Sequence, residues 1–563
     1  MKKTLFLTIF ISLSFGIFAQ TPAKYWVQFT DKNNSKFSVA KPEEFLSPRA
    51  IEKRQRFNIA VTETDLPVNE SYITQVLALD TSIVLYSKSK WHNGITIYCT
   101  NDSIFSLLKA LNFVKFAERT IKLKENESRY KSVFYKSFGN NFATPSNTKP
   151  TKDLDYGKSK EQIYINNAQW LHRLGFRGEG IQMMVLDGGF HNTDSIRHFK
   201  NLRNDGRILG IRNFVQPAID PMRKSERHGT MVLSCIASEV SGELIGTAPK
   251  ISVFLSETED GRSENKVEED NWVAAIEFAD SLGCDVINSS LGYTRYDDDE
   301  KSYNSLLLNG KTSRASLAAA MAAERGIICC ISAGNAGNDA WKYIGTPADA
   351  YDVLAAGGID IYKKRSVFTS YNTPENAAIN RVKPDACTVA TNVWLANPFS
   401  KTTTANGTSF ASPLLAGMVS CLWQAFPQKS AYEVMQAVRL SGSQADKPNE
   451  SLGYGIADML KAYNLLLNPQ NDDFQVKLNN VVLNKKPFVF AVNSNISQNI
   501  EIIIEQENAK FRIQKNFKIK KGKNILKIKE LSKISTNLPF DFVNLKIKSD
   551  VVEEHFVLGI EHN

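Results

Sequence analysis

Apolar and polar positions divide the chain into three folded blocks separated by polar segments. In the first block, four apolar and β-branched runs predict strands: 25–29, 83–87, 94–99 and 113–116. Helical patterns cover 70–78 and 103–111, with Asp102 as a candidate N-cap of the second helix. Strands and helices of this length within about 100 residues indicate a small α+β unit. The polar segment that follows, 122–160, has no clear period and is predicted to be an exposed linker.

The second block, 161–466, alternates short apolar runs with helical patterns, which is typical of an α/β domain with a parallel sheet. Its predicted strands are 181–186, 251–255, 286–288, 327–331 and 353–356. Its predicted helices are 228–238, 272–282, 314–325 and 409–426. Beyond Asn468 and Pro469 the pattern changes to alternation of apolar and polar residues, as from Phe511 to Ile519, and predicts an all-β module.

The N-terminal segment has the pattern of a secretory signal peptide. Two lysines precede an apolar run from Leu5 to Phe18, and Ala19 provides a small residue for cleavage. The alternative is a buried N-terminal strand. Gln20 rather than Cys follows the cleavage point, so we expect no lipid anchor. No later stretch approaches the roughly 18 apolar residues of a membrane span, so we expect an exported protein, in the periplasm, at the cell surface or in the medium.

The composition is that of an ordinary globular chain, with 563 residues, 42% hydrophobic and 23% charged. A net charge of +9 is small for this length and gives no reason to expect nucleic-acid binding. The seven cysteines are an odd number without metal-ligand spacing. Cys329 and Cys330 fall in a predicted buried strand and Cys421 in an apolar helix. We therefore expect small buried side chains, with one disulfide still possible.

Three segments of the second block have residue types suited to nucleophilic catalysis. Asp187 ends a predicted strand, and ligand sites of parallel sheets collect at that edge. His228 opens a predicted helix and is followed by glycine. Ser409 begins another helix, where the positive end of the helix dipole favours a developing negative charge. Taken singly, the three also fit an ordinary turn, a capping or surface histidine and an N-cap serine.

In the order Asp, His, Ser, the motifs V-L-D-G-G, H-G-T-M-V and G-T-S-F-A-S-P resemble those of subtilisin-like serine peptidases, the subtilases. Segment 332–337 is similar to the oxyanion-hole loop of that family, and 289–292 is similar to its substrate-binding strand. Segments 383–386 and 452–455 are similar to flanking landmarks. The resemblance covers about 161–466 and implies a parallel-sheet, subtilisin-like α/β peptidase domain.

The resemblance also implies a role for each matching residue. Ser409 would be the nucleophile, His228 the general base and Asp187 the carboxylate that orients the imidazole. Asn335 would bind the oxyanion together with the backbone N–H of Ser409. The main chain of Ser290, Leu291 and Gly292 would bind substrate. Ala333 and Gly334 would line the first specificity pocket.

Two positions depart from the family pattern. Gly188 follows the aspartate where the family usually has Ser or Thr, and a lost hydroxyl would loosen the hydrogen bonding of the carboxylate. Phe410 replaces the usual Met, an apolar exchange that we expect to be tolerated. The alternatives to a peptidase are a catalytically inactive subtilase fold used for binding, and a surface adhesin or carbohydrate binder based on the C-terminal module.

The order of the blocks resembles the propeptide arrangement of subtilases. We expect a signal peptide at 1–19, a propeptide-like α+β domain and linker at 20–150, a peptidase domain at 151–468 and a β domain at 469–563. The first block would act as an intramolecular chaperone and inhibitor that is released by cleavage between 122 and 160, the alternative being a permanent N-terminal domain.

We expect protein or peptide substrates and a monomer. The chemistry needs no cofactor. Structural calcium, which subtilases often bind, stays possible without assigned ligands, and the acidic run 297–300 is expected to be a solvated loop.

Overall fold

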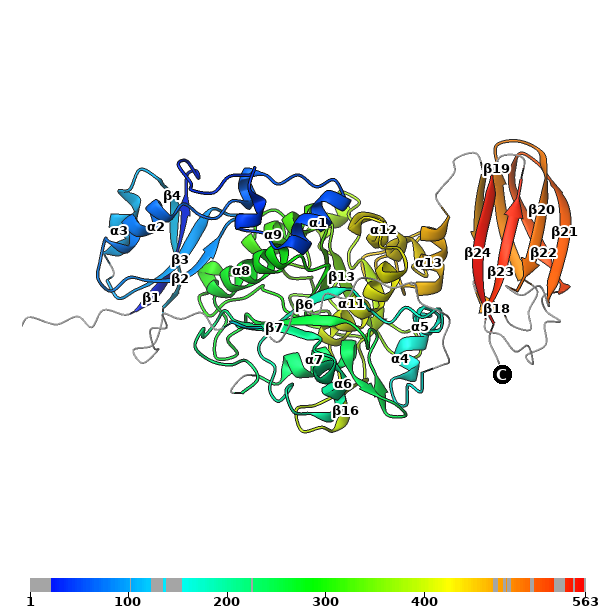
Figure 1. Ribbon diagram of the computed structural model, residues 1–563, viewed down its shortest axis with the longest axis horizontal. Coiled ribbons are helices and arrows are strands. Elements are labelled where there is room, and N and C mark those ends of the chain that lie inside the picture. Colours follow the sequence, from blue (N-terminus) through cyan, green and yellow to red (C-terminus); the bar gives the residue numbers. More distant parts are fainter. Residues whose placement is uncertain are drawn as a thin grey trace, which may run out of the picture.

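The computed structural model describes residues 22–101, 103–122, 135–137, 154–223 and 226–468, together with 474–478, 482–483, 488–506, 511–530, 542–549 and 552–560 of the C-terminal part. An N-terminal sheet, a central sheet between helices and two C-terminal sheets follow one another along the long axis of the molecule (Figure 1). The expected signal peptide lies outside the described residues.

The first block forms a four-stranded antiparallel sheet in the order β2-β3-β1-β4. Its strands are β1 (Ala23–Phe29), β2 (Val84–Ser89), β3 (Gly94–Cys99) and β4 (Val114–Lys122). Helices α2 (Glu70–Leu77) and α3 (Ile104–Lys109) cover one face through a shared core with β1 and β3. Between β1 and α2 lies a further helix, α1 (Pro48–Arg56), with short 3₁₀ turns at Pro42–Glu44 and Glu63–Asp65. The sequence pattern did not predict α1, because Ala50 is the only apolar residue that the helix buries.

The central sheet has eight strands in the order β14-β13-β12-β11-β6-β10-β7-β5. The first seven are parallel: β14 (Ala386–Val389), β13 (Leu354–Ile359), β12 (Ile328–Ser332), β11 (Val286–Ser289), β6 (Gln182–Asp187), β10 (Ser252–Glu257) and β7 (Ile208–Asn213). The edge strand β5 (Tyr135–Ser137) is antiparallel to β7 and lies in the predicted linker. Three residues are too few to show a period, so no pattern in the chain predicts this strand.

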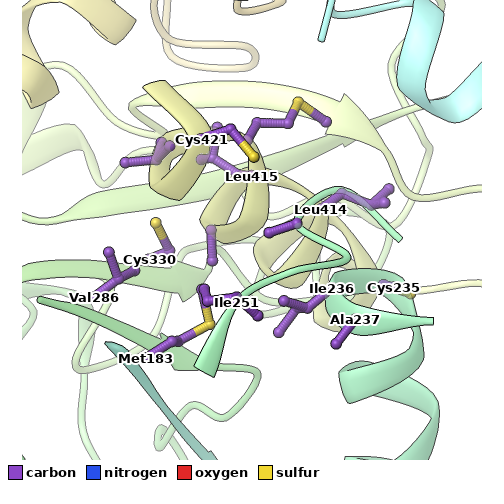
Figure 2. Packing of buried hydrophobic residues seen from close by; sticks show 14 of the residues in the cluster. Met183, Cys235, Ile236, Ala237, Ile251, Val286, Cys330, Leu414, Leu415 and Cys421 are labelled. Atoms are coloured by element: carbon purple, nitrogen blue, oxygen red, sulfur yellow. The ribbon is translucent and has the colours of Figure 1, made fainter. Parts of the chain in front are cut away.

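Helices cover both faces of the central sheet, because successive residues of a strand point to opposite sides. Met183 and Val185 of β6 pack with α7 (His228–Ala237) and α11 (Thr408–Ala425). Met184 and Leu186 pack on the other side with α8 (Val267–Leu282) and α9 (Arg314–Glu324). Figure 2 shows Leu414 and Leu415 of α11 above Met183 and Cys330 in the first of these cores.

The α/β architecture predicted from the alternating pattern is confirmed, although strands β7 and β14 were not predicted and one predicted helix starts five residues late. Helix α8 begins at Val267 and not at Trp272. The first turn contains Glu268, Glu269 and Asp270, all of them buried. Because these residues are acidic, the apolar pattern of the helix does not extend to this turn, and the turn was not predicted. Buried partners explain these acids: for example, Tyr296 and Tyr303 both donate hydrogen bonds to the Glu269 carboxylate.

All seven cysteines are buried and none forms a disulfide. Burial raises the pKa of Cys329 and Cys387 to about 12, which keeps both thiols protonated and unreactive at neutral pH. The expectation of small buried side chains is confirmed.

The C-terminal strands form two sheets, in agreement with the all-β module that the alternating pattern predicted. One has the order β17-β19-β22 and the other β18-β24-β23-β20-β21. The strands are β17 (Phe474–Leu478), β18 (Val482–Leu483), β19 (Phe488–Ser494), β20 (Gln498–Glu505), β21 (Arg512–Ile519), β22 (Gly522–Ile528), β23 (Phe542–Lys548) and β24 (Glu553–Ile560). Trp170 and Leu460 of the central block join the core between these sheets. The Asn464 side chain of α13 (Met459–Leu467) exchanges two hydrogen bonds with the backbone of Val557, which fixes the joint.

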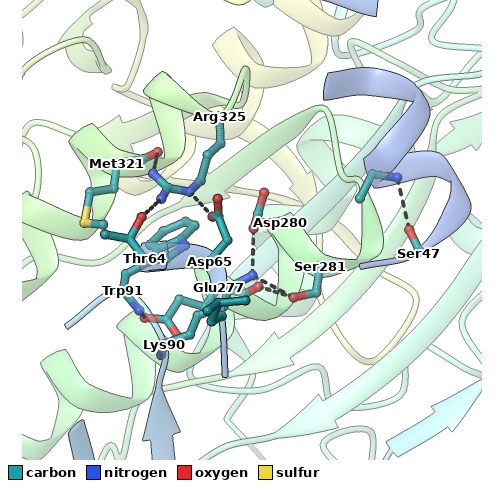
Figure 3. Close-up of polar contacts among 12 residues, drawn as sticks. Ser47, Thr64, Asp65, Lys90, Trp91, Glu277, Asp280, Ser281, Met321 and Arg325 are labelled. Atoms are coloured by element: carbon teal, nitrogen blue, oxygen red, sulfur yellow. Dashed lines mark hydrogen bonds and ion pairs between the residues drawn. The ribbon is translucent and has the colours of Figure 1, made fainter. Parts of the chain in front are cut away.

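Charged side chains join the first block to helices α8 and α9, as Figure 3 shows. Arg54 donates to both Asp65 and Asp280 at about 2.9 Å, and all three side chains are at most 3% exposed. Arg325 contacts the other oxygen of Asp65 at 2.8 Å, and Lys90 contacts Asp280 at 2.8 Å. Arg54 and Arg325 hold the pKa of Asp65 far below its usual range, although burial alone would raise it. Both acids therefore depend on cations from the other side of the interface.

Replacing Arg54 by Leu is expected to destabilise the uncleaved chain by about 3–5 kcal/mol, because it leaves Asp65 and Asp280 buried without that cation. Urea denaturation would measure the loss. Arg56→Leu is the matched control, because Arg56 lies on the same helix and forms its ion pair with Glu52 at a surface where the two side chains are 44% and 67% exposed. Its loss should stay below about 1 kcal/mol. Equal losses in the two variants would contradict the importance of the buried network.

Candidate active site

Asp187 and His228 meet at the carboxyl edge of the central sheet. Asp187 is the last residue of β6 and is completely buried, and His228 is the first residue of α7, with its side chain 38% exposed. The Nδ1 atom of His228 lies 2.9 Å from Oδ1 and 3.1 Å from Oδ2 of Asp187. The second carboxylate hydrogen bond comes from the backbone N–H of Gly188, 2.8 Å from Oδ1. The carboxylate thus holds Nδ1 and leaves the Nε2 side of the ring for another partner.

Ser409 lies in the first turn of α11, with Gly407 at the N-cap. Gly407 has φ 144°, a conformation that favours glycine, and this lets the chain turn sharply into the helix. The Ser409 hydroxyl donates to the carbonyl of Ser290 at 3.3 Å, and the Ser290 hydroxyl donates to the carbonyl of Ser409 at 2.7 Å. No hydrogen bond joins Ser409 to His228 within the described residues, although the neighbouring Phe410 ring contacts the imidazole, with ring centroids 5.6 Å apart.

Asn335 follows β12 and is held against the start of α11. The backbone N–H and the hydroxyl of Thr408 donate to its side-chain oxygen at 2.8 Å and 3.0 Å. The Thr408 hydroxyl in turn accepts a hydrogen bond from the N–H of Gly334 at 3.1 Å. Because its oxygen is engaged, Asn335 presents the NH₂ group on its other side. The side-chain amide is therefore oriented as a donor.

The segment similar to a substrate-binding strand continues β11 beyond Ser289. Ser290 is buried and bound to Ser409, Leu291 is half-buried and Gly292 is exposed. Ala333 is buried after the end of β12, and Gly334 next to it is half-buried. The register β6–β11–β12 therefore brings the ends of these strands to the same edge as Asp187.

Two further carboxylates lie beside the His228–Asp187 pair. A Cβ atom at Gly188 would lie 3.5 Å from Cβ of Glu226 and 3.6 Å from Cβ of Glu259, so both residues flank that position. Burial alone would lower the pKa of His228, but the charge and hydrogen bond of Asp187, with the charges of Glu259 and Glu226, raise it above its ordinary value. The imidazolium form is therefore stabilised.

The carboxylates of Glu259, Glu264 and Glu268 lie within 4.8 Å of one another and are the group whose spacing could hold a cation among the described residues. Tyr293 donates to Glu259 at 2.5 Å, and the backbone N–H groups of Asp260 and Asn265 donate to Glu268 at 3.0 Å. Burial and mutual repulsion raise the pKa of Glu259 and Glu268. We assign no metal to the group. The acidic run 297–300, expected to be a solvated loop, is exposed.

Sequence reasoning missed two residues that build the site. Thr408 orients Asn335, and Ser412 ties the first turns of α11 to the sheet by donating to Asn288 Oδ1 at 2.9 Å and lying 3.0 Å from the carbonyl of Cys330. Both belong to the motif around Ser409. Their position beside Ser409 in the sequence was the signal that could have identified them. Their hydrogen-bond partners lie 73 to 124 residues away in the chain, so the motif does not reveal these contacts.

The central domain is thus a parallel α/β sheet with a hydrogen-bonded Asp–His pair at its carboxyl edge and a serine in the first turn of helix α11. The subtilase family model matches residues 178–455, and a model described as the peptidase S8 propeptide domain of Bacteroidota matches residues 24–133. The chain belongs to the subtilase family.

Curated proteins that are similar to this chain have low sequence identity to it. The chain is 27% identical to subtilisin DY of Bacillus licheniformis over 297 residues, which is 52% of this chain and 93% of that protein. It is 25% identical to the membrane-bound transcription factor site-1 protease of Mus musculus over 382 residues, which is 64% of this chain but only 33% of that relative. Among solved structures, the MycP3 protease from the type VII (ESX-3) secretion system matches with a TM-score of 0.42 and 17% identity, covering 59% of this chain and 94% of that one.

Gly188→Ser, which restores the hydroxyl that the family usually has, is expected to leave folding unchanged within about 1 kcal/mol. Its Cβ would meet neighbours only at ordinary contact distances of 3.5 Å or more. Gly229→Ser is the matched control beside His228, because its Cβ would lie 2.4 Å from the carbonyl oxygen of Gly189 and must displace it. Melting temperatures would test both. A large loss for Gly188→Ser would mean that this turn is more tightly packed than described.

Proposed function

We propose that this protein is an exported serine endopeptidase that hydrolyses peptide bonds through Asp187, His228 and Ser409. The observation that carries the proposal is the buried Asp187 carboxylate hydrogen-bonded to His228 Nδ1 at 2.9 Å, at the edge where Ser409 lies in the first turn of α11. The family match supports a peptidase, and a peptidase of this family takes protein or peptide substrates.

In the proposed reaction, Ser409 Oγ attacks the scissile carbonyl while His228 Nε2 removes its proton. Asp187 fixes the tautomer and stabilises the imidazolium that forms. The Ser409 hydroxyl must first leave the carbonyl of Ser290 and turn toward His228, a rotation about one side-chain bond. Hydrogen bonds of this kind are often formed only once substrate is bound.

The tetrahedral intermediate places a negative charge on the former carbonyl oxygen. The Asn335 NH₂ group and the backbone N–H of Ser409 would donate to this oxyanion. Thr408 supports the arrangement by engaging the oxygen of Asn335, so that the amide need not reorient during the reaction. As the intermediate collapses, the C–N bond breaks and His228 gives its proton to the leaving amine, which leaves an acyl-enzyme on Ser409 that water then hydrolyses with His228 again as the base.

Substrate main chain would lie extended along Ser290, Leu291 and Gly292 and add a strand through backbone hydrogen bonds. Ala333 and Gly334 would line the first specificity pocket with small residues. Recognition through the main chain predicts tolerance of many substrate sequences.

The first block would serve as the propeptide, chaperone and inhibitor of the enzyme. The family match at 24–133 supports a propeptide, and the buried contacts of Arg54 and Lys90 with Asp280 support a specific docked state. Export rests on the signal-like N-terminus. No helix of the described residues is long and apolar enough to cross a membrane.

A catalytically inactive fold used for binding is the second candidate. The absence of the usual hydroxyl at Gly188 is the observation that favours it. Against it, Asp187 retains a hydrogen bond from the Gly188 backbone as well as one to His228.

Ser409→Ala should lower the hydrolysis of a diverse peptide mixture by more than about 10⁴-fold, because the nucleophile is lost. An organophosphorus reagent should label Ser409 alone in the unmodified protein, as mass spectrometry would show. Full activity in the variant, or labelling of another residue, would contradict the assignment. Failure of the folded wild type to cleave any peptide would favour the inactive fold.

The same variant tests the propeptide. The wild-type chain should begin between residues 122 and 160 after maturation, whereas Ser409→Ala should retain the block from about Gln20 if the cut is autocatalytic. N-terminal sequencing of both proteins decides this. A fully active wild type that still begins near Tyr25 would show that the first block is a permanent domain.

Asn335→Ala should reduce kcat by about 100- to 1,000-fold with little change in KM, because the amide acts on the oxyanion and not on bound substrate. Thr408→Val should give a smaller loss, on the order of tenfold, also in kcat, because it removes the hydroxyl hydrogen bond to the Asn335 oxygen and leaves the one from the backbone N–H. A rise in KM at constant kcat would instead assign both side chains to substrate binding.

The pH profile follows from the raised pKa of His228. The base must be neutral, so kcat/KM should be lost as pH falls through a value above the ordinary imidazole pKa of 6.5. Glu226→Gln should move this limb to lower pH, because the Glu226 charge is one of those that raise the pKa of His228. Glu324→Gln is the control, because Glu324 ends α9 before β12, at the opposite edge of the sheet. A shift in the control but not in Glu226→Gln would contradict the electrostatic argument.

A further inference from the structure

A cavity of about 240 Å³ lies at the joint between the central block and the C-terminal sheets. Helices α12 (Ala431–Ser441) and α13 form one wall, and β17 and β24 form the other. Leu465, Val476 and Phe556 contribute apolar surface. A water molecule occupies about 30 Å³ in the liquid, so the cavity has room for a short chain of heavy atoms. It is remote from the proposed catalytic residues, none of which lines it.

Glu554 also lines this cavity, and it is only 6% exposed. Within the described part of the chain, its carboxylate has no hydrogen bond and no ion pair. Its neighbour Glu553 points to the other face of β24, is 40% exposed and contacts His555 at 3.1 Å and Lys548 at 3.4 Å. The strand alternation therefore places one acid in a balanced surface cluster and the other in the cavity without a counter-charge.

The charged groups that line the cavity from the other elements have partners of their own. Lys477 on β17 forms an ion pair with Asp446, in the loop after α12. Lys461 on α13 donates to the carbonyl of Ser441 at 3.3 Å. Neither lysine makes an ion pair with Glu554 in the described structure.

Burial away from water favours the neutral form of a carboxyl group unless a cation or a hydrogen-bond donor is bound to it. Burial raises the pKa of Glu554 to about 7. Near neutral pH the group is therefore half protonated, and a cation in the cavity would favour its charged form. An ammonium group is a suitable partner, because it donates charge-assisted hydrogen bonds to a carboxylate.

We propose that this cavity binds a primary ammonium group carried on a short apolar chain, with the ammonium on Glu554 and the chain against Leu465 and Phe556. A free alkylamine and the side chain of a lysine residue share this chemistry. The site is independent of the proposed peptidase activity, because it lies between α13 and the C-terminal module.

The test is isothermal titration calorimetry on the full chain in its Ser409→Ala form, which prevents self-cleavage. The probes are n-butylamine for the free amine and Nα-acetyl-lysine methylamide for the side chain, with n-butanol and Nα-acetyl-norleucine methylamide as neutral controls. At pH 8 at least one amine should saturate a single site, while its neutral control does not. The amine that binds identifies the source.

Glu554→Gln should weaken amine binding at least tenfold, whereas Glu553→Gln should not change it. Binding by the parent protein should weaken as pH falls from 8 to 6, because Glu554 becomes protonated while the ammonium stays charged. Asp446, Lys461 and Lys477 are the other titratable groups facing the cavity.

Three results would overturn the proposal: no saturable binding of either amine, equal binding of the amines and their neutral controls, or equal losses in Glu553→Gln and Glu554→Gln. Should Glu554→Gln not fold, as judged by its melting temperature, Leu465→Trp fills the cavity and keeps the acid. That variant must lose amine binding for the site to stand.

Discussion

The parallel register of β6, β10, β11 and β12 is the constraint on which the candidate site depends. It pairs Asp187 with Glu257 and Leu186 with Ser289, so the residues that follow each strand emerge at one level. Helix α11 then starts above this edge, because Ser412 hydrogen-bonds Asn288 of β11 and lies within 3.0 Å of the Cys330 carbonyl of β12. A slip of one residue in any of these strands would turn its side chains to the opposite face. The positions of Asp187, Asn335 and Ser409 are thus consequences of backbone pairing in the core.

The interface between the first block and the central block depends on charged side chains. Cations of the first block, Arg49, Lys53 and Arg54, meet acids and carbonyls at the C-terminal end of α8 and the start of β11. Buried ion pairs add little net stability compared with apolar contacts of the same size, but they penalise every misaligned arrangement. Acids such as Asp280 are readily hydrated once the partner leaves. An interface of this chemistry combines a defined docked orientation with solubility of both surfaces after separation, which supports a propeptide that is released.

The sequence predicted those parts of the fold in which periodicity and burial coincide. Strands such as 181–186 and 327–331 are buried on both faces and are recognisable as continuous apolar runs. The motif around Ser409 predicted the candidate site, because the glycine, the serine and the start of the helix are adjacent in the chain. Helix α1 escaped prediction because its contacts are made by Arg49, Lys53 and Arg54 with residues more than 200 positions away. Side-chain orientation, as for Thr408 and Glu554, depends on neighbours that no local pattern contains.

The glycine after Asp187 shows how such a site adjusts to a missing group. The hydroxyl usual at position 188 is absent, and the backbone N–H of Gly188 donates to the carboxylate in addition to His228. The space beside this glycine is bordered by Glu226 and Glu259, whose charges add to that of Asp187 at the imidazole. Burial raises the pKa of Glu259 to about 8, so its charge is fully present at the imidazole only in alkaline solution. In the proposed reaction, a more basic imidazole would accept the serine proton more readily, but its neutral form would be lost at a higher pH. The arrangement would therefore favour catalysis in alkaline rather than acidic solution.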